Sequence, residues 1–174
     1  MRIKSMLLCL VLIMSFPLLS QAASPYTYAS TDSLLMDKPA KKLIYTDVFQ
    51  ITVPDKWSKS DQFLLQDPNS SVAFLACDAK FYANHEAMKY VKIEPIGGSF
   101  SNTKDVSYSG INGKLYEMKV DGKNKDQLPE PFTLIVYDLR GDKTMYIFMF
   151  KANSADYQYL LNVSDAIMQT FKPL

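Results

Sequence analysis

The sequence predicts an α+β domain in which an antiparallel β-sheet carries a short middle helix and a C-terminal amphipathic helix. From Leu43 onward, short apolar or alternating runs recur between turn residues, which is typical of strands joined by hairpins. Near the C-terminus the apolar residues change to helical spacing. A strand-rich chain that ends in such a helix indicates a sheet with helices packed on it.

The chain begins with a segment that has the features of a signal peptide. Arg2 and Lys4 precede an apolar run from Met6 to Leu19, and the small residues Ser20 and Ala22 follow. The run is about 14 residues long, which is shorter than the roughly 20 that a spanning helix needs. We expect residues 1–22 to be a signal peptide, cleaved after Ala22 or Ala23. The mature chain would then be periplasmic or secreted, with no membrane span.

Removal of this leader changes the charge and the cysteine content. Arg2 and Lys4 leave with it, so 17 of the 19 basic residues remain against 18 acidic ones. This balance favours neither nucleic acid nor an anionic membrane as a partner. Cys9 lies inside the leader and follows leucines instead of the small residues that precede a lipid-modified cysteine. Cys77 then remains alone, either buried in its apolar run or paired between chains.

The mature chain is long enough for one domain, over residues 43–174, after a flexible extended segment at 23–42. The run Asp47–Val53 alternates as a half-buried strand, and Trp57 follows it as an apolar anchor. Two further strands, Gln62–Gln66 and Val72–Cys77, are predicted to form a hairpin.

In the middle of the chain, Asn84 is predicted to cap a helix from His85 to about Lys92. Residues 99–105 read as a loop. A hairpin is expected to turn at Gly110–Gly113, because Asn112-Gly113 is a strong hairpin signal. Its strands are Val106–Ser109 and Lys114–Val120.

The last part of the chain is predicted to form two long strands and a helix. A polar loop at 121–131 precedes the strands Phe132–Leu139 and Lys143–Lys151. The second strand is apolar on both faces, which is typical of a central strand covered on both sides, with a membrane-inserting hairpin as the alternative. Ser154 is the expected N-cap of the helix, and Pro173 ends it. Its apolar stripe consists of Leu160, Val163, Ile167 and Phe171.

Three landmarks together resemble the PsbP/Mog-like fold family. They are a strand that runs into Pro54-x-x-Trp57, the Gly110-x-x-Gly113 hairpin, and a terminal helix ending in Gln169-Thr-Phe-Lys-Pro173. Among members of this family, the chain is most similar to DcrB-like bacterial envelope proteins, although it lacks their lipid-modified cysteine. The resemblance implies a binding or assembly module and supplies no catalytic residues.

The sequence offers no convincing catalytic, cofactor or metal site. Cys77 and His85 could form a nucleophile and its base. However, Cys77 is predicted to be buried in the core and His85 to be exposed to solvent at the start of a helix. Asp78, His85 and Glu86 would make a weak metal cluster, and surface charge is the better interpretation. The loop Asp121–Asp126 does not have calcium-loop spacing. Phosphate-binding glycine motifs are absent from the sequence.

We therefore expect a non-enzymatic envelope module that binds a protein partner through a sheet face or the 121–131 loop. Tyrosines near the chain ends could add to such a surface or pack the domain edge; they are Tyr26, Tyr28, Tyr157 and Tyr159. One alternative is a carrier of a small apolar ligand, which needs a closed apolar cavity. Another is a hydrolase, which needs His85 or Cys77 in a cleft beside polar partners.

Overall fold

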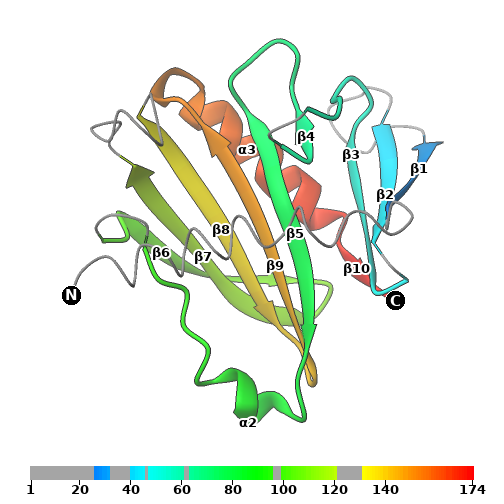
Figure 1. Ribbon diagram of the computed structural model, residues 1–174, viewed down its shortest axis with the longest axis vertical. Coiled ribbons are helices and arrows are strands. Elements are labelled where there is room, and N and C mark those ends of the chain that lie inside the picture. The colour runs from blue at the N-terminus through cyan, green and yellow to red at the C-terminus, as the bar shows by residue number, and fades with distance from the viewer. Residues whose placement is uncertain (1–25, 32–39, 46, 61–62, 96–98, 121–130) are drawn as a thin grey trace.

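A computed structural model describes residues 26–31, 40–45, 47–60, 63–95, 99–120 and 131–174. Two antiparallel sheets and two α-helices make up this part of the chain, which confirms the predicted α+β class (Figure 1). The first sheet has the order β1 (Tyr26–Thr31), β2 (Ala40–Tyr45), β3 (Phe49–Pro54) and β10 (Lys172–Pro173). Strands β1 and β2 lie largely within the segment that was expected to be extended.

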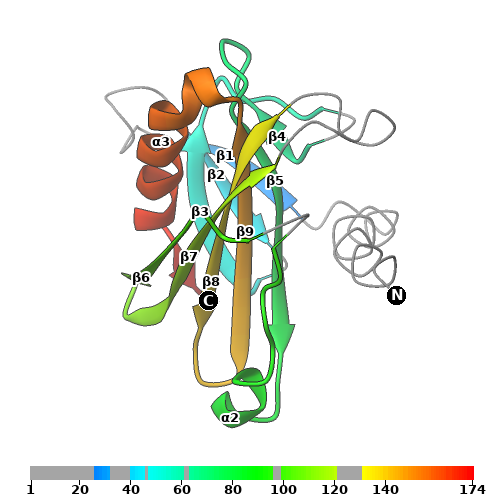
Figure 2. The ribbon, with the colours of Figure 1, turned by 90° about the vertical axis from the view of Figure 1, so that its left-hand side faces the viewer.

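The second sheet contains the long strands of the molecule. Its order is β4 (Leu65–Gln66), β5 (Ala73–Phe81), β9 (Thr144–Ala152), β8 (Phe132–Arg140), β7 (Ile111–Val120) and β6 (Asn102–Tyr108). The helix α3 (Tyr157–Gln169) lies on one face of this sheet, beside the first sheet (Figure 2). The short helix α2 (His85–Met88) lies at the end of the sheet where β8 turns into β9 (Figure 1). None of the described helices is long and apolar enough to cross a membrane.

Strand β9 is central and buried on both faces, as the sequence predicted. Tyr146, Phe148 and Phe150 belong to a large core cluster that includes α3 and β3. Met145, Ile147 and Met149 belong to a second cluster on the opposite face, together with Met88. That second face is covered in part by residues that follow β5, four of which are partly buried against it: Tyr82, Val91, Ile93 and Phe100.

The terminal helix is as predicted on its buried side and differs at both ends. It ends at Gln169, and Pro173, which was expected to end it, lies in strand β10. Leu160, Val163, Ile167 and Phe171 are all at most 3% exposed. The expected N-cap at Ser154 is wrong, because Ser154–Asp156 form a 3₁₀ turn whose N-cap position is Asn153. Ser71 holds the start of the helix in this conformation. Its backbone N–H and hydroxyl donate to the Asp156 carboxylate at 2.8 and 2.6 Å, and its Oγ accepts from Asn153 N–H at 2.9 Å.

The predicted turn of the β6–β7 hairpin is also wrong. The pairing of Tyr108 with Ile111 places the two-residue turn at Ser109-Gly110, with φ values of 50° and 76°. Positive φ at both central positions is what a type I′ hairpin turn requires. Because the register then continues as far as Asn102 opposite Glu117, residues 102–105 are strand and not loop.

Two other predicted elements are present but shorter. The Asn84 side chain accepts from Ala87 N–H at 3.0 Å, which confirms the cap, but α2 ends at Met88 instead of about Lys92. The hairpin that was expected around residues 67–71 is confirmed, with its first strand reduced to Leu65–Gln66. Trp57 is 1% exposed, as expected of an apolar anchor.

Candidate functional site

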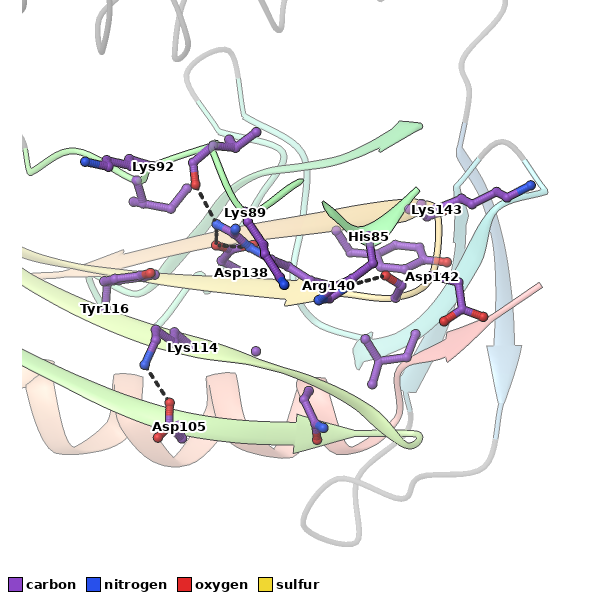
Figure 3. A pocket seen from close by; sticks show the side chains of 18 of the residues that line it. His85, Lys89, Lys92, Asp105, Lys114, Tyr116, Asp138, Arg140, Asp142 and Lys143 are labelled. Carbon is purple, nitrogen blue, oxygen red and sulfur yellow. Dashed lines mark hydrogen bonds and ion pairs between the residues drawn. The ribbon is translucent and has the colours of Figure 1, made fainter. Parts of the chain in front are cut away.

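A groove of about 1270 Å³ lies at the end of the second sheet, where three segments meet (Figure 3). These segments are α2 with the residues that follow it, the β6–β7 hairpin, and the turn between β8 and β9. We call this site the cationic groove, because lysine and arginine outnumber the acids in its lining. The charged side chains that line it are Lys89, Lys92, Asp105, Lys114, Asp138, Arg140, Asp142 and Lys143, with His85 beside them.

The floor of the groove is an ion pair between neighbouring positions of β8. Arg140 Nε and Nη2 donate to the Asp138 carboxylate, with a shortest distance of 2.6 Å, and the Asp138 side chain is only 1% exposed. This hydrogen bond raises the pKa of the Arg140 guanidinium. The guanidinium also donates to the backbone carbonyls of Met88 at 2.6 Å and Val91 at 2.9 Å. Arg140 therefore fixes the segment after α2 to the sheet.

Two lysines of the groove pair with surface carboxylates. Lys89 donates to Glu86 at 2.6 Å, and Lys114 donates to Asp105 at 2.7 Å. These contacts lower the pKa of Glu86 and raise the pKa of Lys114. All four side chains are more than half exposed, so each pair contributes little to stability and can exchange for other charged groups.

Two further lysines have no side-chain partner among the described residues. Lys92 and Lys143 are both exposed, and they lie toward opposite ends of the groove with their ammonium groups pointing outward (Figure 3). An ammonium group that is solvated by water alone can bind a carboxylate or phosphate without breaking an existing ion pair, whereas a paired ammonium group cannot. They are therefore the cations of the groove most available to a ligand.

One exposed aromatic side chain, Tyr90, lies beside the groove. Tyr90 is 84% exposed and lies between two lining residues, Lys89 and Val91.

Phe81 is also exposed, at 70%, but it is not a lining residue. It pairs with Thr144 on β9, so it shares a sheet face with Tyr146 and Phe148, whereas Asp138 and Arg140 pair with Ile147 and Met145 on the other face. Among the described residues, one other large apolar side chain is exposed to this degree, Leu174 at 66%.

A glycine on β7 lets the wall of the groove approach its floor. A Cβ at Gly113 would run into the carbonyl oxygen of Asp138 and lie 2.8 Å from Leu139 Cα. Gly113 therefore permits close contact between β7 and β8 beside the Asp138–Arg140 pair. The Asn112-Gly113 pair thus serves strand packing, and not the turn for which the sequence suggested it.

The structure does not bring the candidate dyad together as a catalytic pair. Cys77 is 2% exposed and belongs to the core cluster, which confirms the expectation of a buried thiol. His85 is exposed, and its Nδ1 lies 3.0 Å from the Gly141 carbonyl oxygen. Because a carbonyl only accepts, Nδ1 must carry the proton of this hydrogen bond. His85 thus helps to hold α2 against the β8–β9 turn.

The weak metal cluster is likewise a set of surface charges. Asp78 lies near Lys80 at 4.0 Å, and Glu86 pairs with Lys89. Within the described ranges, no group of three or more histidine, cysteine or acidic residues could hold a metal ion. The 121–131 loop, including Asp121–Asp126, lies outside the described residues except for its last position.

The two tyrosines of the terminal helix that were considered for a binding surface are partly buried. Tyr157 donates to Glu117 at 2.7 Å, and this hydrogen bond raises its pKa to about 12. Burial raises the pKa of Tyr159 to about 12. Both therefore pack against the domain, while the side chains of Tyr26 and Tyr28 lie outside the described residues.

Sequence reasoning missed the lysines of the groove and the exposed Tyr90 beside them. They come from separate segments, and each lysine stands among neighbours of mixed charge, so no local motif marks them. The one available signal was the Asp138-x-Arg140 pair at the end of an otherwise apolar strand. A charged pair in such a place indicates a polar contact made across the sheet end.

No protein-family model and no curated protein matches the chain. Among solved structures, the chain is similar to the cyanobacterial PsbP (CyanoP) of Synechocystis sp. PCC 6803, determined in solution. The identity is 7%, the TM-score is 0.49, and the match covers 88% of this chain and 96% of that one. A likeness of this strength carries no argument about this chain's family or function.

Proposed function

We propose that the protein is an exported, non-enzymatic binding or assembly module of the bacterial cell envelope, and that it binds a protein partner in the cationic groove. The observation that carries this proposal is the groove's construction: exposed, exchangeable charges around a fixed floor. Small-molecule sites are usually apolar cavities of about 300–1,000 Å³. This groove, at about 1270 Å³ and lined by charged side chains, suits a segment of polypeptide better.

The two alternatives have less support. A carrier of an apolar ligand would need a closed apolar cavity, whereas the groove is open to solvent and eight charged side chains are part of its lining. A hydrolase would need Cys77 or His85 beside polar partners in a cleft. Cys77 lies in the core, and His85, although it lines the groove, is engaged by the Gly141 carbonyl.

The export of the protein and its nearest relatives are parts of the same proposal. Export rests on the leader pattern in residues 1–22, and the likeness to DcrB-like envelope proteins rests on the sequence landmarks alone. The mass of the protein purified from its host's envelope tests the first point. Cleavage after Ala22 or Ala23, without an added lipid, is the expected result.

Photo-crosslinking in the native host tests the groove as the binding site. A benzoylphenylalanine would replace Asn112 or Asp142, which are exposed lining residues on two different walls. The matched controls are exposed positions elsewhere, Lys56 after β3 and Gln158 on α3. We expect one protein to crosslink at both groove positions and at neither control.

The crosslinked protein would then be purified and mixed with the mature chain. Direct binding that protects the groove positions from crosslinking supports the proposal. Equal crosslinking from groove and control positions, or a purified pair that does not bind, refutes it.

A further inference from the structure

Two features of the groove define the chemistry of its partner more narrowly. One is the surplus of available cations, and the other is an exposed aromatic side chain beside the lining, Tyr90. We propose that the groove binds an acidic segment of a protein partner, whose carboxylates pair with the lysines and of which one apolar side chain packs on Tyr90. This inference rests on the proposed function and adds the chemical class of the partner.

The charge argument begins with the groups that the groove uses internally. Arg140 donates hydrogen bonds to the Asp138 carboxylate and to two backbone carbonyls. Because the two side chains already bind each other, neither is available to a ligand. The remaining lining charges are four lysines against Asp105 and Asp142, and Glu86 beside the lining pairs with Lys89, so the surplus is one positive charge. This surplus favours an anionic ligand, and Lys92 and Lys143 at opposite ends favour one that spans the groove (Figure 3).

The two paired lysines can also bind the partner's carboxylates, and this exchange does not require any buried group to lose water. Glu86 and Asp105 are 69% and 86% exposed, so they can return to water when a partner carboxylate replaces them at Lys89 and Lys114. An exchange of this kind costs little, because surface pairs contribute little in the first place. An extended acidic segment could therefore meet up to four ammonium groups along the groove.

The aromatic argument is independent of charge. Tyrosine is among the residue types that most often contribute strongly to protein–protein binding energy. Tyr90 is 84% exposed and stands between two lining residues, Lys89 and Val91. The Arg140 hydrogen bonds to Met88 and Val91 hold the backbone on both sides of Tyr90, so its ring projects from a fixed support. A pre-positioned aromatic loses less entropy on binding.

Aromatic and lysine side chains together are also typical of membrane-surface binding. The shape of the site favours a protein segment over a bilayer. The lysines line a concave groove that also contains Asp105 and Asp142, whereas an anionic bilayer presents a flat surface that would face both acids. Membrane binding is therefore the main competing outcome of the test.

The test is selection from a random peptide library on the immobilised mature protein. The same library is selected in parallel on two charge-matched variants, Lys92→Glu/Lys143→Glu and Lys56→Glu/Lys119→Glu. Lys119 is a suitable control because it lies on β7 with Lys114, is exposed, and pairs with Thr133 at the opposite end of the sheet. We expect the native protein and the control to enrich peptides rich in Asp and Glu with Leu or Phe between them.

One enriched peptide is then synthesised with a twin that carries Gln and Asn in place of its acids. Affinity should fall by about two- to five-fold for each groove lysine reversed, and should weaken with added salt. The change Tyr90→Ser should weaken binding at least about ten-fold. The matched changes Phe81→Ser and Leu174→Ser, which remove exposed large apolar side chains outside the groove lining, should leave it unchanged.

Phosphatidylglycerol vesicles and neutral vesicles provide the competing arm. The inference is overturned if the selected peptides show no acidic bias, if Lys92→Glu/Lys143→Glu binds as the native protein does, or if the anionic vesicles bind and displace the peptide. A partner that crosslinks in the groove through a segment without acidic residues would overturn this inference and leave the proposed function intact. Failure of every groove crosslink would remove the proposed function itself.

Discussion

Arg140 connects the floor of the groove to the segment that carries Tyr90. Replacing it by methionine would leave the Asp138 carboxylate buried without its cation and two backbone carbonyls without a donor. We expect Arg140→Met to lower the free energy of unfolding by about 3–5 kcal/mol, as for other buried pairs that lose one partner. Urea denaturation measures this change.

The double variant Asp138→Leu/Arg140→Met provides the control for that interpretation. Because it removes both charges, it should be more stable than Arg140→Met alone. Equal destabilisation of the two variants would show that the lost carbonyl contacts account for the whole effect, and not the unpaired carboxylate.

Gly113 allows a test of close strand packing at a single atom. A Cβ there meets the backbone of Asp138 and Leu139, which cannot move without separating β7 from β8. We expect Gly113→Ala to cost about 1–3 kcal/mol, the usual range for an overpacked site. Gly141→Ala is the control, since the nearest atom to its Cβ would be 3.5 Å away. Similar thermal midpoints for the two variants would contradict this account.

At the level of elements, the start of α3 depends on a contact with the β4–β5 turn. Ser71 donates two hydrogen bonds to Asp156, and they lower the pKa of this carboxyl below its ordinary value of 3.8. A folded-state pKa that is depressed contributes stability above the unfolded value, and this contribution is lost as pH falls through the folded value. Asp156→Asn should therefore be less stable than the native chain at neutral pH, and this disadvantage should shrink as pH falls through the lowered folded-state pKa of Asp156.

Urea midpoints at neutral and at acid pH measure this difference. Ser71→Ala should remove much of the same pH-dependent stability, and the double variant should add little to either single change. A native advantage that persists unchanged in acid would assign the effect to packing instead of to the carboxylate.

The elements show why some of this fold could be predicted from sequence and some could not. The apolar patterns of β9 and α3 were enough to predict these two elements. A continuous apolar run identifies a strand covered on both faces, and apolar residues at helical spacing identify a helix with one buried stripe. The hairpin turn was misplaced because Asn112-Gly113 has the stronger local signal. The register instead puts the turn at Ser109-Gly110 and uses Gly113 where β7 approaches β8.

The groove could not be predicted from local sequence patterns, for a different reason. Its walls come from α2, the β6–β7 hairpin and the β8–β9 turn, which the topology brings together. Lys92 and Lys143 are far apart in sequence, and each looks like an ordinary solvated lysine. A site made of surface charges from separate segments has no spacing that a sequence could reveal.

At the scale of the whole molecule, one core joins the two sheets. Phe171 follows α3, and its ring centroid lies 6.1 Å from that of Phe49 on β3 and 5.1 and 5.5 Å from those of Tyr146 and Phe148 on β9. The same cluster contains Trp57, the one tryptophan of the chain. Because these side chains share one buried volume, neither sheet should keep its structure when the other unfolds.

We therefore expect unfolding to be a single transition. Trp57 fluorescence reports on the region after β3, and far-ultraviolet circular dichroism is dominated by the longer strands and α3, so the two signals should give the same urea midpoint. Phe171→Leu should shift both midpoints together to lower urea, while the exposed change Gln158→Ala should shift neither. If the fluorescence transition preceded the dichroism transition, the first sheet would be a separate unit that unfolds first. Phe171 would then pack between two units without coupling their stability.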